Sequence, residues 1–499
     1  MAREDSPLLE NYISAFVAGA AVMVLEIIAT RILEPFLTNS IFTWIGVLSV
    51  MLISLSLGYF LGGRIADRNP RYTYIGWIFV LSAVSVALIP LFSYDVLNFS
   101  ASFGIMYGPF VASAILFSVP SILLAMVSPY LVKRSSKKLS RLGEVSGNIY
   151  AVSTVGSIAG TLLTGYVIIP NMGVKAAIFS LSIVLAANGA LFLGRKGLLL
   201  VAACLLLNYA VPQPANFKSS AKNAVVYETY SPYQYLRVID RADGTRTLST
   251  GVGGQTQIFL NSTNLTSTYT QYQELVYLLK PDARKALFIG LGGGAMPRNM
   301  HERTDADITI VEIDPAVVQI AKDFFNFSED ARMRVETGDG RFFLSKSKET
   351  YDYIVVDAYI IPLPPFHLTT YEFVEELRKH LNPGGIVFVN IGSALEGSRS
   401  GMFKAIFSTY RSQFKNVYVF PSDDSNYSRS TNIVLLATDV DYGTKEKFVE
   451  RISNLTNNSE TISFASSYYD RPVYLSSEPI LTDDFCPIEM IGISSLNRK

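Results

Sequence analysis

The sequence predicts two fold classes in one chain: an N-terminal α-helical multi-pass membrane domain and a C-terminal α/β domain with a doubly wound parallel sheet. The first observation is charge density. Residues 1–216 hold 13 basic and 8 acidic residues, about 10% of that half, whereas residues 217–499 hold 29 and 34, about 22%; ordinary soluble domains carry roughly 25%. The second is the apolar pattern, because long apolar segments come first and short strands alternating with glycine turns and helices follow from Lys285.

Whole-chain composition excludes several classes of protein. The net charges of the halves, +5 (13 − 8) and −5 (29 − 34), cancel over 499 residues, so no basic excess indicates a nucleic-acid partner. Cys204 and Cys486 allow at most one disulfide and match no zinc spacing, so we expect free thiols and no metal. A wholly soluble enzyme, a disulfide scaffold and a pure channel are excluded.

A membrane span needs about 20 largely apolar residues in a helix. Six segments meet this requirement: 12–36, 41–62, 73–94, 107–131, 147–169 and 174–194. A seventh, 197–211, is only marginally long enough. We expect residues 1–211 to form a transmembrane domain of six or seven spans in the cell membrane, with the lipid bilayer as its partner.

Basic residues predict the orientation of these spans. Loops 63–72 and 133–141 are rich in Arg and Lys, and Arg195 and Lys196 follow the sixth span. The N-terminus and the segments that follow the even-numbered spans should therefore be cytoplasmic. If 197–211 lies on the membrane, the globular half is cytoplasmic, and if it spans, that half is extracytoplasmic. We expect the cytoplasmic location and keep the other as the alternative.

The membrane half also contains polar residues that need an explanation, because ionisable groups are costly in a bilayer. Arg31 and Glu34, one helical turn apart, are expected to pair, and Glu26 lies deeper, as an inter-helix or a substrate contact. The small residues of 153–160 should allow close helix packing. The stretch 63–68 resembles a loop of major-facilitator transporters.

The globular half begins with a small β subdomain, 212–282. Its strands are expected at 224–230, 234–240 and 246–260, with turns at Asp243-Gly244 and Gly253-Gly254. Residues 283–499 should form a Rossmann-like nucleoside-binding catalytic domain. Its expected strands are 286–291, 308–313, 334–337, 353–356, 386–391, 417–420 and 432–437, and its expected helices are 296–303, 315–325 and 370–381.

Ligands of such sheets bind beyond the carboxyl ends of the strands. Gly290 and the run Gly292, Gly293 and Gly294 let the backbone approach a ligand that a Cβ would exclude. Acidic residues end the next strands. Glu312 is suited to two ribose hydroxyls, Asp339 before Gly340 to an adenine amino group, and Asp357 follows the fourth strand.

These motifs resemble the spermidine synthase (polyamine aminopropyltransferase) family, in particular its membrane-fused members. The residues that carry the resemblance are Ser231-Pro232-Tyr233-Gln234, Tyr272-Gln273-Glu274, Gly292-Gly293-Gly294, Val311-Glu312-Ile313-Asp314, Gly338-Asp339-Gly340, Tyr351-Asp352, Asp357 and Leu481-Thr482-Asp483-Asp484. In the N-terminal half they are Glu26, Arg31, Trp44, Gly58-Tyr59 and Gly62-Gly63.

The resemblance implies a role for individual residues. The nucleoside of S-adenosylmethionine or of its decarboxylated form would be held by Gln234, Glu312, Asp339, Gly340 and Pro364. Asp357 would help deprotonate the attacking amine, and Tyr272 and Gln273 would line the acceptor site. From the residue type alone, His367 is a second candidate base or binding group, with capping of the following helix as the alternative.

Two positions depart from the family pattern. Ala295 stands where the family usually has an aspartate for the donor's propylamine, and Ile360 where it has one for the polyamine. Both changes remove negative charge from places that bind cations, which makes intact S-adenosylmethionine a plausible donor. The first hypothesis is therefore an S-adenosyl-dependent aminopropyltransferase. Its alternatives are a methyltransferase for a membrane-proximal lipid or glycan, and a transporter or sensor with a nucleoside- or polyamine-binding domain. A homodimer is the assembly considered.

Overall fold

The computed structural model describes residues 8–37, 40–68, 71–136, 139–194, 223–250, 253–262, 265–358, 363–473 and 479–497. The chain forms two compact units. One comprises Met1–Ser219 with Thr229–Tyr235, and the other comprises Ser220–Glu228 with Leu236–Lys499. The marginal seventh span, 197–211, lies outside the described residues, and the domain boundaries at 211 and 282 stay predictions.

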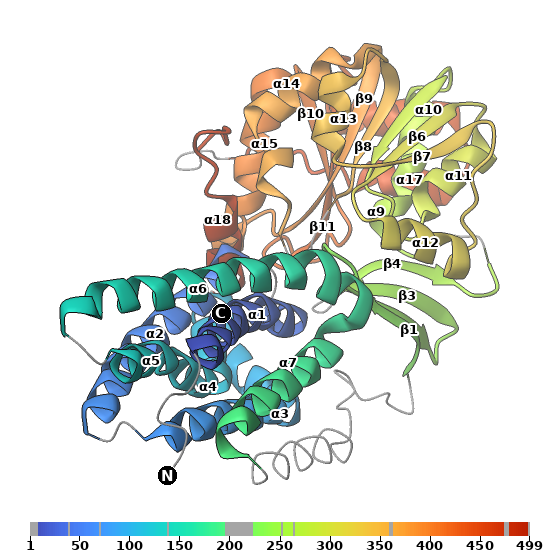
Figure 1. Ribbon diagram of the computed structural model, residues 1–499. Helices are drawn as coiled ribbons and strands as arrows, with labels where there is room; N and C mark the ends of the chain where they lie inside the picture. The colour runs from blue at the N-terminus through green and yellow to red at the C-terminus, as the bar shows by residue number, and fades with distance from the viewer. Residues whose placement is uncertain are drawn as a thin grey trace. The chain divides into compact units, whose positions relative to one another are not determined.

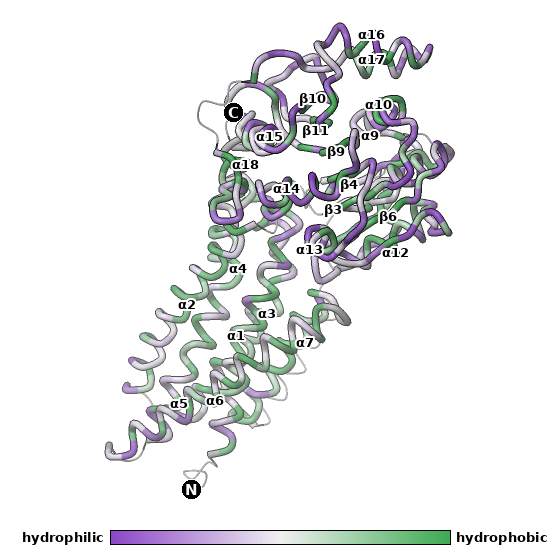
Figure 2. Tube along the Cα trace, turned by 90° about the horizontal axis from the view of Figure 1, so that it is seen from above, coloured by the Kyte–Doolittle hydropathy of each residue, from purple (hydrophilic) through white to green (hydrophobic). Residues whose placement is uncertain are grey.

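The first unit is helical (Figure 1). Its elements are α1 (Leu8–Leu37), α2 (Ile41–Arg68), α3 (Tyr72–Ala101), α4 (Gly104–Ala125), α5 (Val127–Ser135), the 3-10 turn η1 (Leu139–Arg141), α6 (Leu142–Leu163), the π-helical η2 (Thr164–Ile168) and α7 (Ile169–Leu193). Among the described residues, six helices are long and apolar enough to cross a membrane: Leu9–Leu37, Ile41–Arg68, Thr73–Ala101, Gly104–Ser135, Leu142–Ile168 and Gly173–Leu193. Figure 2 shows hydrophobic residues along these helices, which correspond to the six predicted spans.

Helices α1 and α6 pack backbone to backbone. A Cβ at Gly156 would lie 2.1 Å from the carbonyl oxygen of Phe16, and one at Gly160 would lie 2.5 Å from that of Ala20. The Ser157 hydroxyl donates to the Gly19 carbonyl at 3.2 Å. The predicted packing role of the small residues in 153–160 is confirmed, because a larger side chain at either glycine would push the helices apart.

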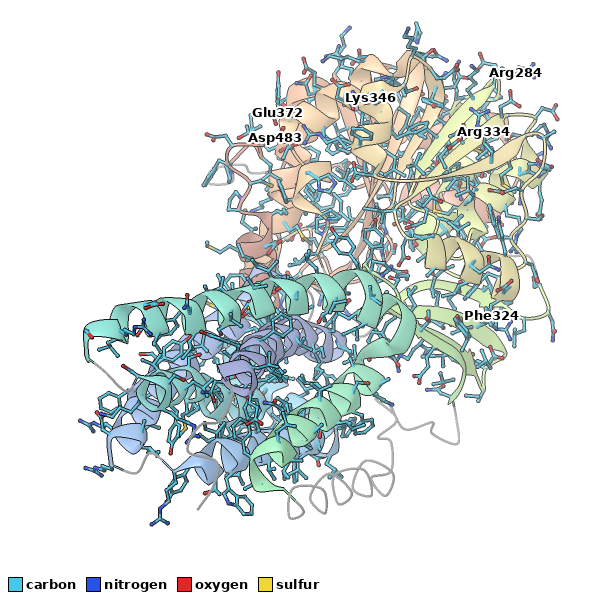
Figure 3. All side chains as sticks on the ribbon, viewed as in Figure 1. Arg284, Phe324, Arg334, Lys346, Glu372 and Asp483 are labelled. Atoms are coloured by element: carbon cyan, nitrogen blue, oxygen red, sulfur yellow. The ribbon has the colours of Figure 1, made fainter. Side chains whose placement is uncertain are left out.

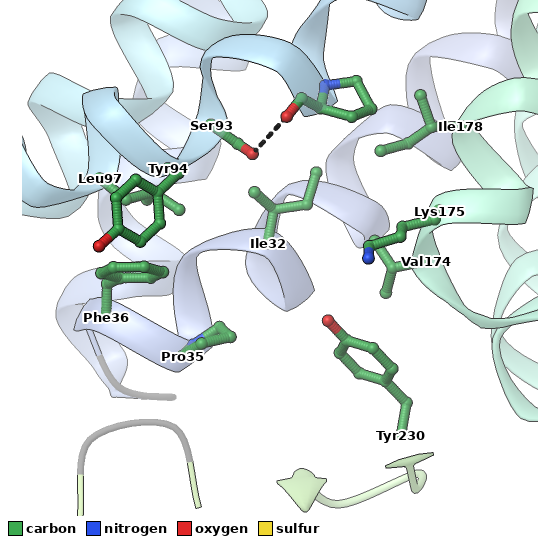
Figure 4. A pocket seen from close by; sticks show the side chains of 11 residues that line it. Ile32, Pro35, Phe36, Ser93, Tyr94, Leu97, Val174, Lys175, Ile178 and Tyr230 are labelled. Atoms are coloured by element: carbon green, nitrogen blue, oxygen red, sulfur yellow. Dashed lines mark hydrogen bonds between the residues drawn. The ribbon is translucent and has the colours of Figure 1, made fainter. Parts of the chain in front are cut away.

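The polar residues of α1 have defined positions. Arg31 pairs with Glu34 at 3.3 Å, as predicted, and also donates to the carbonyl of Pro232. Glu26 is half-buried. A pocket among α1, α3 and α7 is lined mainly by apolar and aromatic side chains, including Phe36, Tyr94 and Tyr230, together with Lys175 (Figure 4).

The chain also forms two sheets, which lie in the second unit except for residues 229–235. The smaller sheet has the order β1 (Asn223–Tyr230), β2 (Tyr235–Arg241), β3 (Thr245–Thr250) and β4 (Gly253–Phe259), and β3 pairs antiparallel with β2 and with β4. The region 246–260 forms two strands, although the glycines of its predicted turn, Gly253 and Gly254, already belong to β4. The first predicted turn is present, with Gly244 at φ +79°. Leu236, Val238, Leu248 and Ile258 form one apolar cluster with Val317 and Ile320 of α12 (Pro315–Phe324).

The larger sheet has the order β10-β11-β9-β8-β5-β6-β7. Its strands are β5 (Lys285–Ile289), β6 (Asp307–Glu312), β7 (Met333–Thr337), β8 (Tyr351–Val356), β9 (Leu381–Ser393), β10 (Asn416–Pro421) and β11 (Thr431–Thr438). Its helices and helical turns are α9 (Thr268–Gln271), α10 (Gln273–Leu279), α11 (Ala295–Arg303), α12 (Pro315–Phe324), α13 (Gly340–Lys346), η3 (Phe366–Leu368), α14 (Tyr371–Lys379), η4 (Gly397–Arg399), α15 (Gly401–Gln413), α16 (Lys445–Leu455), α17 (Ser459–Ser466) and α18 (Ile488–Asn497).

Both faces of this sheet are covered. Phe288, Tyr353 and Phe388 point into a core shared with α10, α11, α16 and α17. Alternate side chains point to the opposite face of the sheet. On that face Leu287 and Val387 are fully buried, and α14 and α15 contact β9. The predicted doubly wound architecture is confirmed.

The prediction of an all-parallel sheet is wrong at one edge. Strands β9, β8, β5, β6 and β7 run parallel, but β11 pairs antiparallel with β9, and β10 pairs antiparallel with β11. Residues 422–430, which join β10 to β11, contain no helix. A parallel connection needs a crossover of a dozen or more residues, so this short link requires a hairpin.

Candidate active site

The turn that follows β5 is built from glycines that the fold requires. Gly290 has φ +99°, and a Cβ there would lie 2.3 Å from the carbonyl oxygen of Asp357. Gly292 and Gly294 have φ +53° and +73°. The Gly293 N–H donates to the Thr256 hydroxyl of β4 at 2.9 Å. The small sheet therefore supports the turn, a contact that the sequence analysis missed.

Glu312 ends β6 as predicted and is only 7% exposed. Its carboxylate accepts the Leu291 N–H at 2.9 Å and the Asp314 N–H at 3.0 Å. Burial raises the pKa of Glu312 above its ordinary value, and the backbone donors oppose that rise. The two donors fix the carboxylate beside the glycine turn.

Asp339 begins α13, and its Oδ1 accepts the Phe342 N–H at 2.8 Å as a helix cap. Its Oδ2 lies 2.8 Å from Nε2 of His367 in η3. A Cβ on the next residue, Gly340, would lie 2.4 Å from Ile289 Cγ2, so a glycine is needed for the helix to approach β5. The structure thus brings three predicted site residues together.

Asp357 follows β8 beside the glycine turn, and both of its carboxylate oxygens receive donors. Asn390 Nδ2 of β9 donates to Oδ1 at 2.9 Å, and the Tyr269 hydroxyl of α9 donates to Oδ2 at 3.2 Å. Removal from water raises the pKa of the Asp357 carboxyl above its ordinary value, while the two hydrogen bonds lower it. Neither Tyr269 nor Asn390 was predicted, because each lies far from Asp357 in sequence.

Tyr272 and Gln273, the predicted acceptor-site residues, are buried in the described structure. The Tyr272 hydroxyl donates to the Pro421 carbonyl at 2.5 Å and lies 2.9 Å from Ser467 Oγ; burial raises the pKa of Tyr272 to about 12. Gln273 accepts from the Tyr277 hydroxyl at 3.2 Å. Both side chains therefore have protein partners, and their acceptor role stays a prediction.

Three further predicted positions have different surroundings. Gln234 is 5% exposed, and its N–H donates to Ser231 Oγ at 3.0 Å within the segment that belongs to the helical unit. Pro364 is buried just before η3. Ile360, the position of a lost aspartate, lies outside the described residues.

Asp483 is a structural anchor. It forms a two-point ion pair with Arg341 of α13, at 2.7 and 2.6 Å, and accepts from Thr370 Oγ1 at 2.8 Å. Its N–H donates to Glu372, and Figure 3 labels both residues. The Arg341 guanidinium holds the pKa of Asp483 below its ordinary value. Since Arg341 also donates to the His367 carbonyl, this anchor fixes η3 against α13.

The strand order arranges the acidic groups in space. At the carboxyl ends of the parallel strands, the spatial order is Asp357 after β8, the glycine turn after β5, Glu312 at the end of β6 and Asp339 after β7. Neighbouring strands lie about 4.8 Å apart, so three steps separate the outer carboxylates by roughly 14 Å. The edge therefore presents acceptors along a length suited to an extended ligand with several hydroxyl or amino groups.

Comparison with known proteins gives consistent matches. The family model for the spermine/spermidine synthase domain matches residues 270–421. A probable polyamine aminopropyl transferase of Bifidobacterium longum is 29% identical over 289 residues, 55% of this chain and 64% of that protein. The chain thus spans less than two thirds of that relative. Polyamine aminopropyltransferase 2 of Aquifex aeolicus is 24% identical over 402 residues, 76% of this chain and 78% of that protein.

Among solved structures, a probable spermidine synthase from Corynebacterium glutamicum aligns with a TM-score of 0.42 and 18% identity, over 51% of this chain and all of that one. The seven-stranded mixed sheet, with helices on both faces and acidic residues at the ends of its parallel strands, defines an α/β domain. In sequence, the chain is similar to the spermine/spermidine synthase domain over residues 270–421 and to polyamine aminopropyltransferases over a longer range.

Proposed function

We propose that the globular unit transfers an aminopropyl group from decarboxylated S-adenosylmethionine to an amine acceptor of the polyamine class. The observation that carries this proposal is the position of Asp357. Its carboxylate lies beside the glycine turn, receives a donor on each oxygen, and has a pKa raised by removal from water. A carboxylate with a raised pKa is a better proton acceptor. The family matches support the same activity.

The chemistry needs alignment more than activation, because a sulfonium is already a good leaving group. The neutral amine nitrogen attacks the carbon of the aminopropyl group that is bonded to sulfur. A C–N bond forms, and the bond between that carbon and sulfur breaks. The sulfonium takes the bonding electrons and leaves as the neutral thioether methylthioadenosine. The proton lost from the amine goes to Asp357. In this proposal Glu312 binds the ribose hydroxyls and Asp339 accepts from the adenine amino group.

The test uses the full chain purified in detergent or lipid nanodiscs. It is incubated with decarboxylated S-adenosylmethionine and a panel of di- and polyamines, and products are identified by mass. A product heavier by one aminopropyl group, together with methylthioadenosine, is expected. Formation of neither with any amine would overturn the proposal.

Methyl transfer from intact S-adenosylmethionine is the second candidate, and Ala295 favours it. Ala295 is the first residue of α11 and is 7% exposed. An aspartate there would repel the donor's carboxylate, and alanine does not. Incubation with methyl-labelled donor and membrane extract distinguishes the two, because label then appears in a lipid or glycan fraction.

We also propose that the helical unit anchors the protein in the cell membrane, with the globular unit in the cytoplasm, where an S-adenosyl donor is available. The six apolar helices support the anchoring. The test replaces Cys204 and Cys486 with serine and introduces N261C at an exposed turn. A membrane-impermeant thiol reagent should label N261C only after the cells are opened; labelling of intact cells would place this unit outside.

A further inference from the structure

Two amide side chains connect Asp357 to the antiparallel edge of the sheet. Asn390 of β9 donates Nδ2 to Asp357 Oδ1 at 2.9 Å, and its own Oδ1 accepts from Asn432 Nδ2 of β11 at 3.0 Å. Asn390 is 5% exposed. Val434 is the register partner of Asn390, so Asn432, two residues away, points from the same face of the sheet. The chain of bonds crosses three neighbouring strands.

The direction of these bonds is what matters. An asparagine amide has a donor end and an acceptor end. While Asn432 donates to the oxygen of Asn390, the NH₂ group of Asn390 must face Asp357. If Asn390 turned over, its oxygen would face a carboxylate oxygen, and its NH₂ would face the NH₂ of Asn432. Both contacts would be repulsive.

We infer that Asn390 and Asn432 are positioning residues that keep Asp357 ionised and oriented as the proton acceptor. The inference rests on the proposed function, since it assigns these amides a role toward the same base. Tyr269 donates to the second oxygen, so both oxygens are held as acceptors before the amine arrives. In the described structure the Asn432 side chain bonds to Asn390, and through it the inference connects position 432 to Asp357.

The test is a double-mutant cycle that compares the kinetics of N390L, N432L and the double variant with those of the wild type. Leucine has a similar volume and no hydrogen-bonding groups. We expect kcat/KM to fall about 100-fold in N390L and about tenfold in N432L, with the dissociation constant of methylthioadenosine unchanged within twofold. Because Asn432 acts through Asn390, the double variant should match N390L within twofold. Additive losses, or an N432L variant with wild-type kinetics, would overturn the inference.

Asn416 provides a matched control. It is a half-buried asparagine on β10 whose Nδ2 donates to the Val440 carbonyl at 3.0 Å, so N416L removes a comparable bond away from Asp357. Its kinetics and pH profile should match the wild type. A loss in N416L equal to that in N432L would mean that the effect is general destabilisation of the sheet edge, which also overturns the inference.

A second readout is independent of turnover. Infrared titration, with D357N as the reference for assignment, follows the protonated carboxyl of Asp357. Loss of the Asn390 donor should raise its pKa, and N432L should raise it less, while N416L should not move it. If no amine is alkylated, the proposed function fails. The titration still tests whether the hydrogen bonds from Asn432 through Asn390 lower the pKa of Asp357. If N390L does not fold, the pKa of Asp357 in N432L decides the question. An unchanged pKa in N432L would overturn the inference.

Discussion

The imidazole of His367 lies with Nε2 2.8 Å from Oδ2 of Asp339, across 28 positions of sequence. This contact ties His367 to the carboxylate proposed for the nucleoside. The bonds to Asp357 come instead from Asn390 and Tyr269. Under the proposed function, His367 therefore holds the nucleoside-binding Asp339 in place, and Asp357 is the proton acceptor.

Replacing His367 tests this division of roles. In H367A we expect the dissociation constant of methylthioadenosine to rise about tenfold, because Asp339 loses one of its two partners. The value of kcat should stay within about threefold. Isothermal calorimetry and steady-state kinetics measure the two quantities, and H367Q, which keeps a donor, is the control. A hundredfold fall in kcat with unchanged binding would instead make His367 the base.

The substitution D357N should abolish transfer, by about 10³-fold or more, and leave methylthioadenosine binding intact. It should also stabilise the fold near neutral pH. The pKa of Asp357 is raised in the folded protein, so the charged form is disfavoured by folding, and stability is lost as pH rises through the folded pKa. Thermal denaturation should show a higher Tm for D357N at pH 7 and a smaller difference as pH falls. A lower Tm at pH 7 would contradict this account.

Donor choice should depend on the first residue of α11. With Ala295, calorimetry should show no large preference for decarboxylated over intact S-adenosylmethionine. In A295D the new carboxylate should attract the propylamine and repel the intact donor's carboxylate, shifting the ratio of affinities at least tenfold toward the decarboxylated form. A295N, of similar size and without charge, is the control. A hundredfold preference in the unsubstituted protein would refute this interpretation of Ala295.

Asp352 should stabilise the fold without taking part in transfer. It is 8% exposed and accepts the Arg284 N–H at 2.7 Å, the Lys285 N–H at 3.1 Å and Asn382 Nδ2 at 2.8 Å. Its pKa is lowered: burial acts to raise it, and the hydrogen bonds together outweigh that effect. The carboxylate's contribution is therefore present above the unfolded pKa and lost as pH falls through the folded one.

In D352N we expect a loss of about 1–3 kcal/mol of unfolding free energy at pH 7 and a smaller loss in acid. The amide cannot accept all three donors. Denaturant titration at several pH values measures the effect. The control is D307N, at an exposed position on β6, which should change stability by about 0.5 kcal/mol or less. Equal losses in the two variants would argue against the hydrogen-bond explanation.

The acidic strand ends could be predicted because they depend on local pattern. Glu312 and Asp357 each follow a short apolar run, and a parallel sheet brings such ends to one edge. Tyr269 and Asn390 could not be found in this way. Their partners lie 88 and 33 positions away, and an asparagine within a strand has no pattern that distinguishes a functional amide from a structural one.

The direction of β11 was missed, although a signal was present. Residues 422–430 are rich in Ser, Asp and Asn and have no helical apolar period, which is typical of a hairpin link and too short for a crossover. The preceding strands alternate with helices, and this alternation ends before β11. Pairing in the sheet, rather than local preference, decided the outcome.

The hairpin β10–β11 has a consequence for how this protein can change. Donor recognition is proposed for residues 290–340, whereas the orientation of the base depends on position 432, carried by a short hairpin. A single substitution in that hairpin can therefore alter the pH at which the protein works and leave its choice of donor untouched. Donor choice and working pH are then open to separate evolution, and to separate engineering.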